Sequence, residues 1–324
     1  MLPNFTYVRP GSLDAAIREL STPDTHLHAG GTDLLGCLRN GIVPAKKLVS
    51  LSGLKELRGI AEAPGGGWRI GALTPLAEVA AHPALAKSCA ALTQAAGSVA
   101  SPQLRNQGTL GGNLCQRPRC WYFRSSDFHC LRKGGDTCFA AEGENEYHCI
   151  FGGSGCVMVH PSDTAPALIA LEARVRIAGP KGPRTVPLAS FFAGPIDELT
   201  KETVLAPGEI LTEILVPASP ANLRSFYRKA RVRAAWDFAL AGAAVALRVT
   251  DGRIEWARVV LAAVAPVPWR SAEAEKALVG KPLNAQTIAQ AAAAAVKGAE
   301  PLSQNAYKVD LVEGIVEEAL SALV

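Results

Sequence analysis

What the sequence lacks argues against several classes of protein. It has no block of like charge, because the Lys and Arg residues behind its net charge of +4 are spread along the chain, so nucleic-acid binding has little support. The longest apolar stretch, residues 238–247, is too short and too rich in Ala and Gly to cross a bilayer as a helix. Residues 1–7 lack a basic region followed by an apolar core, which predicts a cytoplasmic protein, with export alongside a signal-bearing partner as the alternative.

Familiar cofactor and metal signatures are missing as well. The sequence contains neither a GxGxxG fingerprint nor the lysine-bearing phosphate loop. Its eight cysteines form neither the CxxC pairs of zinc sites nor the runs of ferredoxins. What remains is a chain of 324 residues with 48% apolar and 19% charged residues, which predicts a folded protein of two or three domains.

Two glycine turns are the first positive signal. Gly30 and Gly31 stand between a strand-like segment and a helical run, and Gly111 and Gly112 follow about eighty residues later. Glycine lets the backbone approach a ligand closely, and the free N–H groups at the start of a helix favour an anion. A tight turn explains either pair taken alone, whereas two such loops together can hold the two ends of a dinucleotide.

The second signal is a segment with six of the eight cysteines, residues 115–156. Clustered thiols in a chain with no sign of secretion predict a metal or iron-sulfur centre. Their spacing does not name the metal, so a structural zinc module stays an alternative. The sequence between them is polar and long for a loop, and such loops usually have a function. The other two cysteines, Cys37 and Cys89, are expected to be buried thiols.

Hydrophobic periodicity predicts alternating helices and strands. We expect helices over residues 13–20, 34–39, 76–81 and 84–99, and strands over 25–29, 47–51, 68–72, 173–177, 184–188 and 210–217. Residues 65–67 are predicted to turn a hairpin between strands 47–51 and 68–72, and residues 103–113 to form a loop. The proline-rich residues 217–220 are the predicted linker, after which strands and alanine-rich helices complete a last domain.

A group of cations opens that last domain: Arg228, Lys229, Arg231 and Arg233. A solvated basic face is the ordinary interpretation of such a group. Its position beside the domain junction also offers contact with an anionic cofactor.

The order of four motifs resembles one family. Residues 29–34, 104–113, 160–163 and 227–229 are similar to those of the FAD-binding medium subunits of molybdenum hydroxylases, which include xanthine dehydrogenases, carbon monoxide dehydrogenases and bacterial aldehyde oxidoreductases. Most members lack the cysteine segment. It resembles the insertion of the [4Fe-4S]-containing flavin subunits of periplasmic aldehyde oxidoreductase and 4-hydroxybenzoyl-CoA reductase, and its local sequence looks closer to the aldehyde oxidoreductase branch.

The resemblance, which covers nearly the whole chain, implies an α+β fold. A two-subdomain FAD-binding fold of the PCMH or vanillyl-alcohol-oxidase-like type would span residues 1–220. Its subdomains would cover about 1–55 and 56–220, with the iron-sulfur insertion at about 115–158. A smaller α+β domain of the carbon monoxide dehydrogenase flavoprotein C-terminal type would follow over residues 221–324.

The resemblance also implies site residues. Those for FAD are Ala29, Gly30, Gly31, Thr32, Asp33, Leu34, Thr109, Gly112, Asn113, Asp163, Leu211 and Lys229. Residues 29–34 would lie along the pyrophosphate and Asp163 would hydrogen-bond the cofactor. Lys229 would border the flavin, where a cation stabilises the anionic reduced ring. The implied [4Fe-4S] ligands are Cys120, Cys130, Cys138 and Cys156. Cys115 and Cys149 are expected to be spectators, with Cys149 as the alternative fourth ligand, and no residue is expected to be an acid-base catalyst.

The function that the resemblance implies is electron transfer within an oxidoreductase complex. In the family a large molybdopterin-binding subunit hydroxylates the substrate, a small subunit carries two [2Fe-2S] clusters, and FAD passes the electrons to an external acceptor. We expect an aldehyde oxidoreductase, with a 4-hydroxybenzoyl-CoA reductase-like or xanthine dehydrogenase-like complex as the alternative. A stand-alone flavin reductase, which would carry its own substrate base and need no partners, is the rival outside these complexes.

Overall fold

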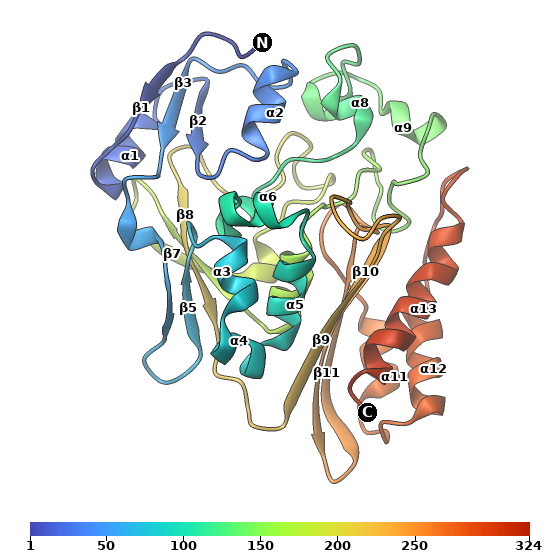
Figure 1. Cartoon of the computed structure of the whole chain (residues 1–324). Helices are drawn as coiled ribbons and strands as arrows, with labels where there is room; N and C mark the ends of the chain where they lie inside the picture. Colours follow the sequence, from blue (N-terminus) through green and yellow to red (C-terminus); the bar gives the residue numbers. More distant parts are fainter.

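Three β-sheets follow one another along the chain in the computed structural model, which describes residues 1–324 (Figure 1). The first sheet is parallel, in the order β1-β3-β2, with strands β1 (Thr6–Val8), β2 (Thr25–His28) and β3 (Lys47–Ser50). Parallel strands need crossover connections, and helices α1 (Leu13–Glu19) and α2 (Leu34–Arg39) lie in them. The Ser12 hydroxyl caps α1 by accepting a hydrogen bond from the Ala15 N–H.

The second sheet is antiparallel, in the order β4-β5-β8-β6-β7. Its strands are β4 (Ile60–Glu62), β5 (Trp68–Gly71), β6 (Arg174–Ala178), β7 (Arg184–Pro187) and β8 (Ile210–Val216). The hairpin prediction around residues 65–67 was wrong about the partner, because β5 pairs with β4 and not with β3. A turn of 3₁₀ helix, η1 (Lys55–Leu57), lies between β3 and β4, and these two strands belong to different sheets. A second such turn, η3 (Leu188–Ser190), follows β7.

Helices between β5 and β6 build the centre of the molecule. They are α3 (Leu76–Ala81), α4 (Pro83–Ser88), α5 (Ala90–Ser98), α6 (Pro102–Gln107), α7 (Leu110–Leu114) and α10 (Thr164–Ala170). The single helix predicted over residues 84–99 is in fact α4 and α5, because the backbone at Cys89 (φ −138°, ψ 49°) leaves the helical region. The loop predicted over residues 103–113 was also wrong: the side chains of Ser101 and Thr109 cap the short helices α6 and α7 there.

The third sheet is antiparallel, in the order β12-β11-β10-β9, and is covered on both faces. Its strands are β9 (Leu223–Ala230), β10 (Ala241–Thr250), β11 (Arg253–Ala262) and β12 (Trp269–Arg270). Helices α11 (Ala272–Leu278), α12 (Ala285–Ala295) and α13 (Tyr307–Ser321) cover one face, and α5 and α10 contact the sheet from the other side (Figure 1). Along β10, Ala244 and Ala246 enter one core while Val245 and Leu247 enter the other. Such a strand reads as a continuous apolar run because no face meets water.

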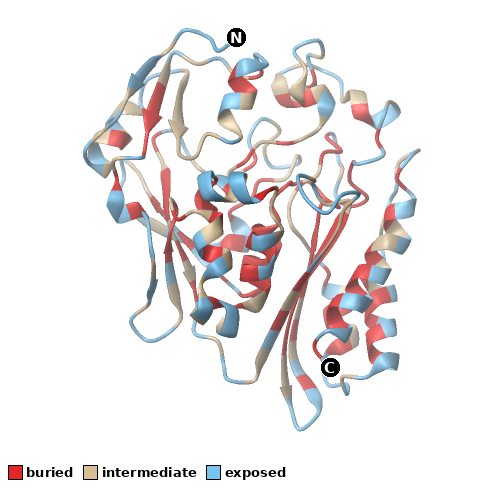
Figure 2. Cartoon of the chain, in the orientation of Figure 1, coloured by how far each residue is buried: buried red, intermediate tan, exposed pale blue.

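The cysteine segment lies at the end of the molecule beside α2 and contains little regular structure (Figure 1). It has two single-turn helices, α8 (Trp121–Arg124) and α9 (Phe139–Glu142), and a 3₁₀ turn, η2 (Leu131–Lys133). Figure 2 shows the red, buried positions concentrated in the sheets and central helices. The domain boundaries predicted near residues 55 and 220 lie between strands of different sheets. The division into domains remains a prediction. No helix combines the length and apolar character that a membrane span requires.

Candidate functional site

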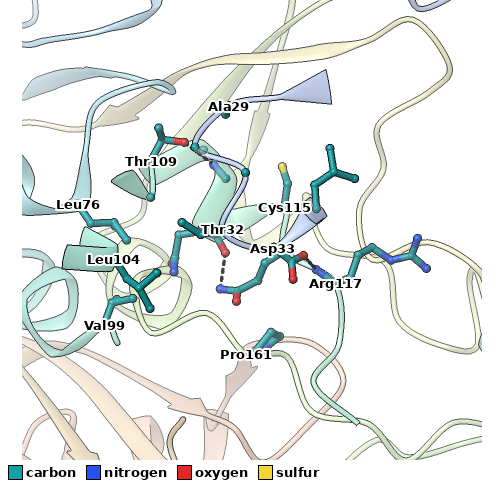
Figure 3. Close-up of a pocket in the computed structure, with 18 of the residues that line it drawn as sticks. Ala29, Thr32, Asp33, Leu76, Val99, Leu104, Thr109, Cys115, Arg117 and Pro161 are labelled. Atoms are coloured by element: carbon teal, nitrogen blue, oxygen red, sulfur yellow. Dashed lines mark hydrogen bonds between the residues drawn. The ribbon is translucent and has the colours of Figure 1, made fainter. Parts of the chain in front are cut away.

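A cleft of about 510 Å³ receives residues from all three sheet regions. Figure 3 shows part of its lining. The turn after β2 contributes one wall and helix α7 a second. Strands β8 and β9, the loop after β9, helices α3 and α6 and the segments after α7 and before α10 also contribute residues. The cleft brings together all of the residues predicted for FAD, which are Ala29, Gly30, Gly31, Thr32, Asp33, Leu34, Thr109, Gly112, Asn113, Asp163, Leu211 and Lys229. Residues from five separate parts of the sequence therefore share one site.

The turn after β2 presents a row of free backbone donors. No backbone N–H of residues 29–34 donates a hydrogen bond to another group of the chain, and the first ladder of α2 begins only at the Leu35 N–H. Unpartnered N–H groups at the start of a helix favour an anion, because their dipoles point at the ligand. This wall of the cleft therefore suits a phosphate or pyrophosphate group.

The two glycine loops touch each other. A Cβ atom built on Gly30 would lie 2.1 Å from the backbone oxygen of Gln107, which no real side chain permits. The Gln107 side-chain amide in turn donates to the Gly30 oxygen over 3.2 Å. On the other loop, the Thr109 hydroxyl accepts from the Gly112 N–H at 3.1 Å, which fixes the first turn of α7. Glycine at residue 30 is thus needed for the close approach that shapes the cleft.

A buried ion pair lies at the base of the cleft. Lys229 on β9 donates to Asp163 over 2.8 Å, and their side chains are only 3% and 6% exposed. The Tyr227 hydroxyl donates to the other carboxylate oxygen at 2.7 Å. Burial and the neighbouring carboxylate raise the pKa of Tyr227 well above its usual range, so this phenol stays a neutral donor. Because Asp163 offsets the charge of Lys229, the pair offers the cleft an oriented ammonium group rather than a net positive charge.

The remaining cations after the linker do not line the cleft. Arg228 points to the opposite face of β9 and pairs with Glu318 on α13, as strand alternation requires. Arg231 donates to the backbone oxygen of Ser98, and Arg233 to that of Trp236. Of the basic group singled out in the sequence, Lys229 alone reaches the cleft.

Residues of the cysteine segment also form part of the cleft, which the sequence did not predict. Cys115, Arg117 and Arg119 line it (Figure 3 labels Cys115 and Arg117). Asp33 ties the two parts together: it accepts from the Arg117 N–H at 2.8 Å and pairs with Arg119 at 2.9 Å. The sequence did contain one signal for this contact: an arginine on each side of Pro118, directly before the first predicted ligand.

A small cavity within the segment brings the four predicted ligands together. Cys120, Cys130, Cys138 and Cys156 line it, and Cys120 directly follows Arg119 of the cleft. The Cys149 side chain faces Gly153 instead, and burial raises its pKa to about 12. No three His, Cys, Asp or Glu side chains converge as a single metal ion requires. The structure thus separates the four predicted ligands from both predicted spectators, since Cys115 lies in the cleft.

Buried donors surround this cavity. The Cys138 thiol lies within hydrogen-bonding reach of Cys156 and lowers the pKa of that residue, and the nearby Arg132 guanidinium acts in the same direction. Arg132 is buried, yet its Nε and Nη2 groups have no hydrogen-bond partner in the chain. Unpartnered buried N–H groups are costly, so the cavity suits an anionic group bound to thiolates.

The C-terminal domain holds the cysteine segment in place through its last helix, α13, and the residues before it. The Asn305 amide donates to the backbone oxygens of His148 and Cys149 at 3.1 and 3.0 Å. Lys308 is fully buried and donates to the backbone oxygen of Tyr147 at 3.1 Å. Burial lowers the pKa of Lys308 to about 8. Side chains from the end of the chain therefore fix the backbone between the predicted ligands.

Comparison with known proteins gives one consistent result. The family described as the FAD binding domain in molybdopterin dehydrogenase matches residues 3–219, and the carbon monoxide dehydrogenase flavoprotein C-terminal domain matches residues 199–323. The FAD-binding subunit PaoB of an aldehyde oxidoreductase from Escherichia coli K12 is 36% identical over 98% of this chain and 97% of its own length. The carbon monoxide dehydrogenase medium chain of Hydrogenophaga pseudoflava is 31% identical over 99% and 97%.

Solved structures agree with this result along the whole chain. The Hydrogenophaga pseudoflava carbon monoxide dehydrogenase, solved in a form without the Mo-pyranopterin moiety, superposes with a TM-score of 0.79 at 30% identity, covering 100% of this chain and 98% of that one. Quinoline 2-oxidoreductase from Pseudomonas putida 86 gives a TM-score of 0.79 at 27% identity, with coverage of 100% and 98%. The predicted α+β fold is confirmed, and the chain belongs to the FAD-binding medium subunits of the molybdenum hydroxylase family.

Proposed function

We propose that this chain is the electron-transfer subunit of an aldehyde oxidoreductase, with FAD in the cleft and a [4Fe-4S] cluster in the cysteine segment. The observation that carries the FAD site is the row of six free N–H groups at residues 29–34, in a cleft with the other predicted FAD residues. Bound FAD would supply the redox chemistry that accepts electrons and passes them on.

The residues of the cleft would bind and orient the cofactor rather than act as acids or bases. Residues 29–34 would hold the pyrophosphate, with Thr109, Gly112 and Asn113 forming the facing loop. Leu211 and Lys229 would border the flavin, and Asp163 would fix the position of the Lys229 ammonium group. Arg117 and Arg119 would add guanidinium N–H donors to the same cleft from the cysteine segment, while Glu202 and Asp33 offset their charges.

The cluster is proposed on the four cysteines that share one cavity, Cys120, Cys130, Cys138 and Cys156. A cubane cluster binds each cysteine through a different iron atom, so its ligands surround a cavity instead of converging on one point. A zinc module would instead need ligands that converge on a single metal ion. The unpartnered N–H groups of Arg132 support an anionic cluster at this position.

The partners we propose are a large molybdopterin-binding subunit and a small subunit with two [2Fe-2S] clusters, and an external acceptor would take the electrons from FAD. The substrate would be an aldehyde, since a relative 36% identical over 98% of this chain serves an aldehyde oxidoreductase. Purines and aromatic thioesters are the competing substrate classes. Location would follow the partners: a twin-arginine signal on the small subunit would take the complex to the periplasm, and the complex would otherwise stay in the cytoplasm.

Purification of the chain with and without its partners tests the proposal. The isolated chain should be yellow-brown, contain FAD and about four iron atoms per chain, and fail to oxidise aldehydes. The complex with both partners should oxidise an aldehyde and reduce an added acceptor. A colourless chain with bound zinc would contradict the cluster, and aldehyde turnover by the isolated chain without molybdenum would contradict the division of labour.

A further inference from the structure

The surroundings of the cysteine cavity point to residues that set a reduction potential; this inference rests on the proposed [4Fe-4S] site. A cluster held by four thiolates is anionic and becomes more negative when it gains an electron. N–H groups aimed at its sulfurs and buried cations beside it stabilise the reduced state, so they raise the potential. Two buried side chains of this chain are placed to act in this way, and a third is placed to oppose them.

His148 is the first of these residues. Its ring is buried, and its Nε2 lies 3.2 Å from the sulfur of Cys120. Iron ligation requires a deprotonated thiolate, and a thiolate can only accept a hydrogen bond. In the loaded site the contact must therefore run from the Nε2 hydrogen of His148 to the Cys120 sulfur. The Asn305 amide donates to the His148 backbone oxygen at 3.1 Å and so holds the backbone that carries this ring.

Arg132 is the second. It lines the same cavity as the four cysteines and is itself buried. Its Nη1 group donates to the backbone oxygen of Lys201 at 3.1 Å and to Glu202 at 3.0 Å, whereas Nε and Nη2 have no partner. A buried guanidinium needs acceptors for all its donors. Thiolate sulfur is the acceptor that a loaded cavity would offer, above all that of Cys156, which lies within reach of the Arg132 guanidinium.

Glu202 opposes these donors. Its carboxylate is buried and pairs with two arginines, Arg132 at 3.0 Å and Arg117 Nε at 2.8 Å. Arg117 lines the FAD cleft. Glu202 therefore offsets part of the positive charge next to the cysteine cavity, and it does so from a position between the two proposed cofactors.

We propose that His148 and Arg132 are positioning residues that raise the reduction potential of the cluster by donating N–H groups to the sulfurs of Cys120 and Cys156, and that Glu202 lowers this potential by offsetting the charge of Arg132. None of the three is a ligand. Together they determine how readily the cluster exchanges electrons with FAD in the adjoining cleft.

The test is a redox titration of the cluster, followed by EPR, in the full-length chain loaded with FAD and iron. His148→Phe and Arg132→Met should each make the potential more negative, by about tenfold in the one-electron equilibrium, which corresponds to about 59 mV. Glu202→Gln should shift it in the opposite direction. His148→Gln, which keeps an N–H group, should recover part of the loss. His129→Phe is the matched control, because His129 is an exposed histidine of the same segment and should leave the potential unchanged.

Shifts of opposite sign in the reduction potentials of Arg132→Met and Glu202→Gln distinguish this inference from general damage to the site. Such damage would shift the potentials of all variants in the same direction. Unchanged potentials in His148→Phe and Glu202→Gln would overturn it, as would a shift in the same direction for Arg132→Met and Glu202→Gln. If Arg132→Met fails to keep its iron, Arg132→Lys takes its place in the titration. This variant retains the positive charge, so its reduction potential should lie between the value expected for Arg132→Met and that of the wild type. A wild-type chain without any cluster would instead refute the proposed function on which the inference rests.

Discussion

The cleft and the cysteine segment lie side by side but are built on different principles. The cleft is formed largely by the ends of strands and helices, and the donors of its first wall, residues 29–34, are backbone N–H groups whose direction the fold sets. The cysteine segment has little regular structure, and its cavity depends on the side chains that line it and on others that hold its backbone. The cleft should thus be sensitive to added volume where backbones touch, and the segment to the loss of single side chains.

Replacement of one predicted ligand should give the largest effect. In Cys156→Ser the hard serine oxygen replaces a soft thiolate, which iron-sulfur clusters prefer, so we expect the chain to lose its iron while it keeps FAD. Iron and FAD contents of the purified variant measure both. Cys149→Ser is the matched control and should keep the cluster, because its side chain faces Gly153 and not the cavity. Full cluster retention in Cys156→Ser would reject the ligand assignment.

Acid should destabilise the chain at His160, which is buried and lines a cavity together with Cys120 and Asp163. Burial lowers the pKa of His160 to about 3, below its unfolded value of about 6.5. Between these two pH values His160 binds a proton in the unfolded state but not in the folded state. The free energy of unfolding should therefore fall by up to about 4 kcal/mol as the pH falls from 6.5 to 3. His160→Phe, which keeps the ring packed against Phe192, should remove this loss. Denaturant unfolding at pH 7 and pH 4 measures it, and an equal acid sensitivity in both proteins would contradict the assignment to His160.

Added volume should affect the cleft alone. In Gly30→Ala the new methyl group would meet the Gln107 oxygen at 2.1 Å, so the two loops must move apart at a cost of about 1–3 kcal/mol. We expect FAD to bind about 10- to 100-fold more weakly, as fluorescence titration would show, with the iron content unchanged. Gly36→Ala on α2 is the matched control, because nothing lies within 4 Å of its new Cβ atom. If both variants bind FAD as the wild type does, contact between the loops does not shape the site.

The smallest effect should come from outside both regions. Ser12→Ala removes the cap of α1 and should cost about 1 kcal/mol of stability, without loss of FAD or iron. Thermal unfolding of the loaded chain would detect the change. Ser21→Ala, an exposed serine, should change stability by less than about 0.5 kcal/mol. Cofactor loss in Ser12→Ala would mean that the first helix contributes to the sites.

Local signals in the sequence were sufficient where a single element determined the outcome. Helix α1, strands β6 and β7, and the burial of Cys37 and Cys89 follow from residue type and period. Pairing between sheets did not follow, because β3 and β5 have the same strand-like composition and only the long-range register separates them.

The candidate site shows the same limit. Its glycine turns and cysteines could be read from the sequence, and the family resemblance supplied their grouping. The neutralisation of Lys229 by Asp163 and the entry of Arg117 and Arg119 into the cleft could not be predicted. These contacts join residues more than 60 positions apart in the chain, as the separation of 66 positions between Asp163 and Lys229 illustrates.

The contacts of Asn305 and Lys308 with the cysteine segment have a consequence for biosynthesis. The ribosome makes the N-terminal parts of a chain first, and domains generally fold in that order. The four predicted ligands are therefore synthesised well before the side chains that fix the backbone between them, since Asn305 lies 157 positions after His148. Until the last helix emerges, the cysteines remain on an unclamped loop. A cluster that reached this segment during synthesis would therefore meet the four predicted ligands before Asn305 and Lys308 hold the backbone between them.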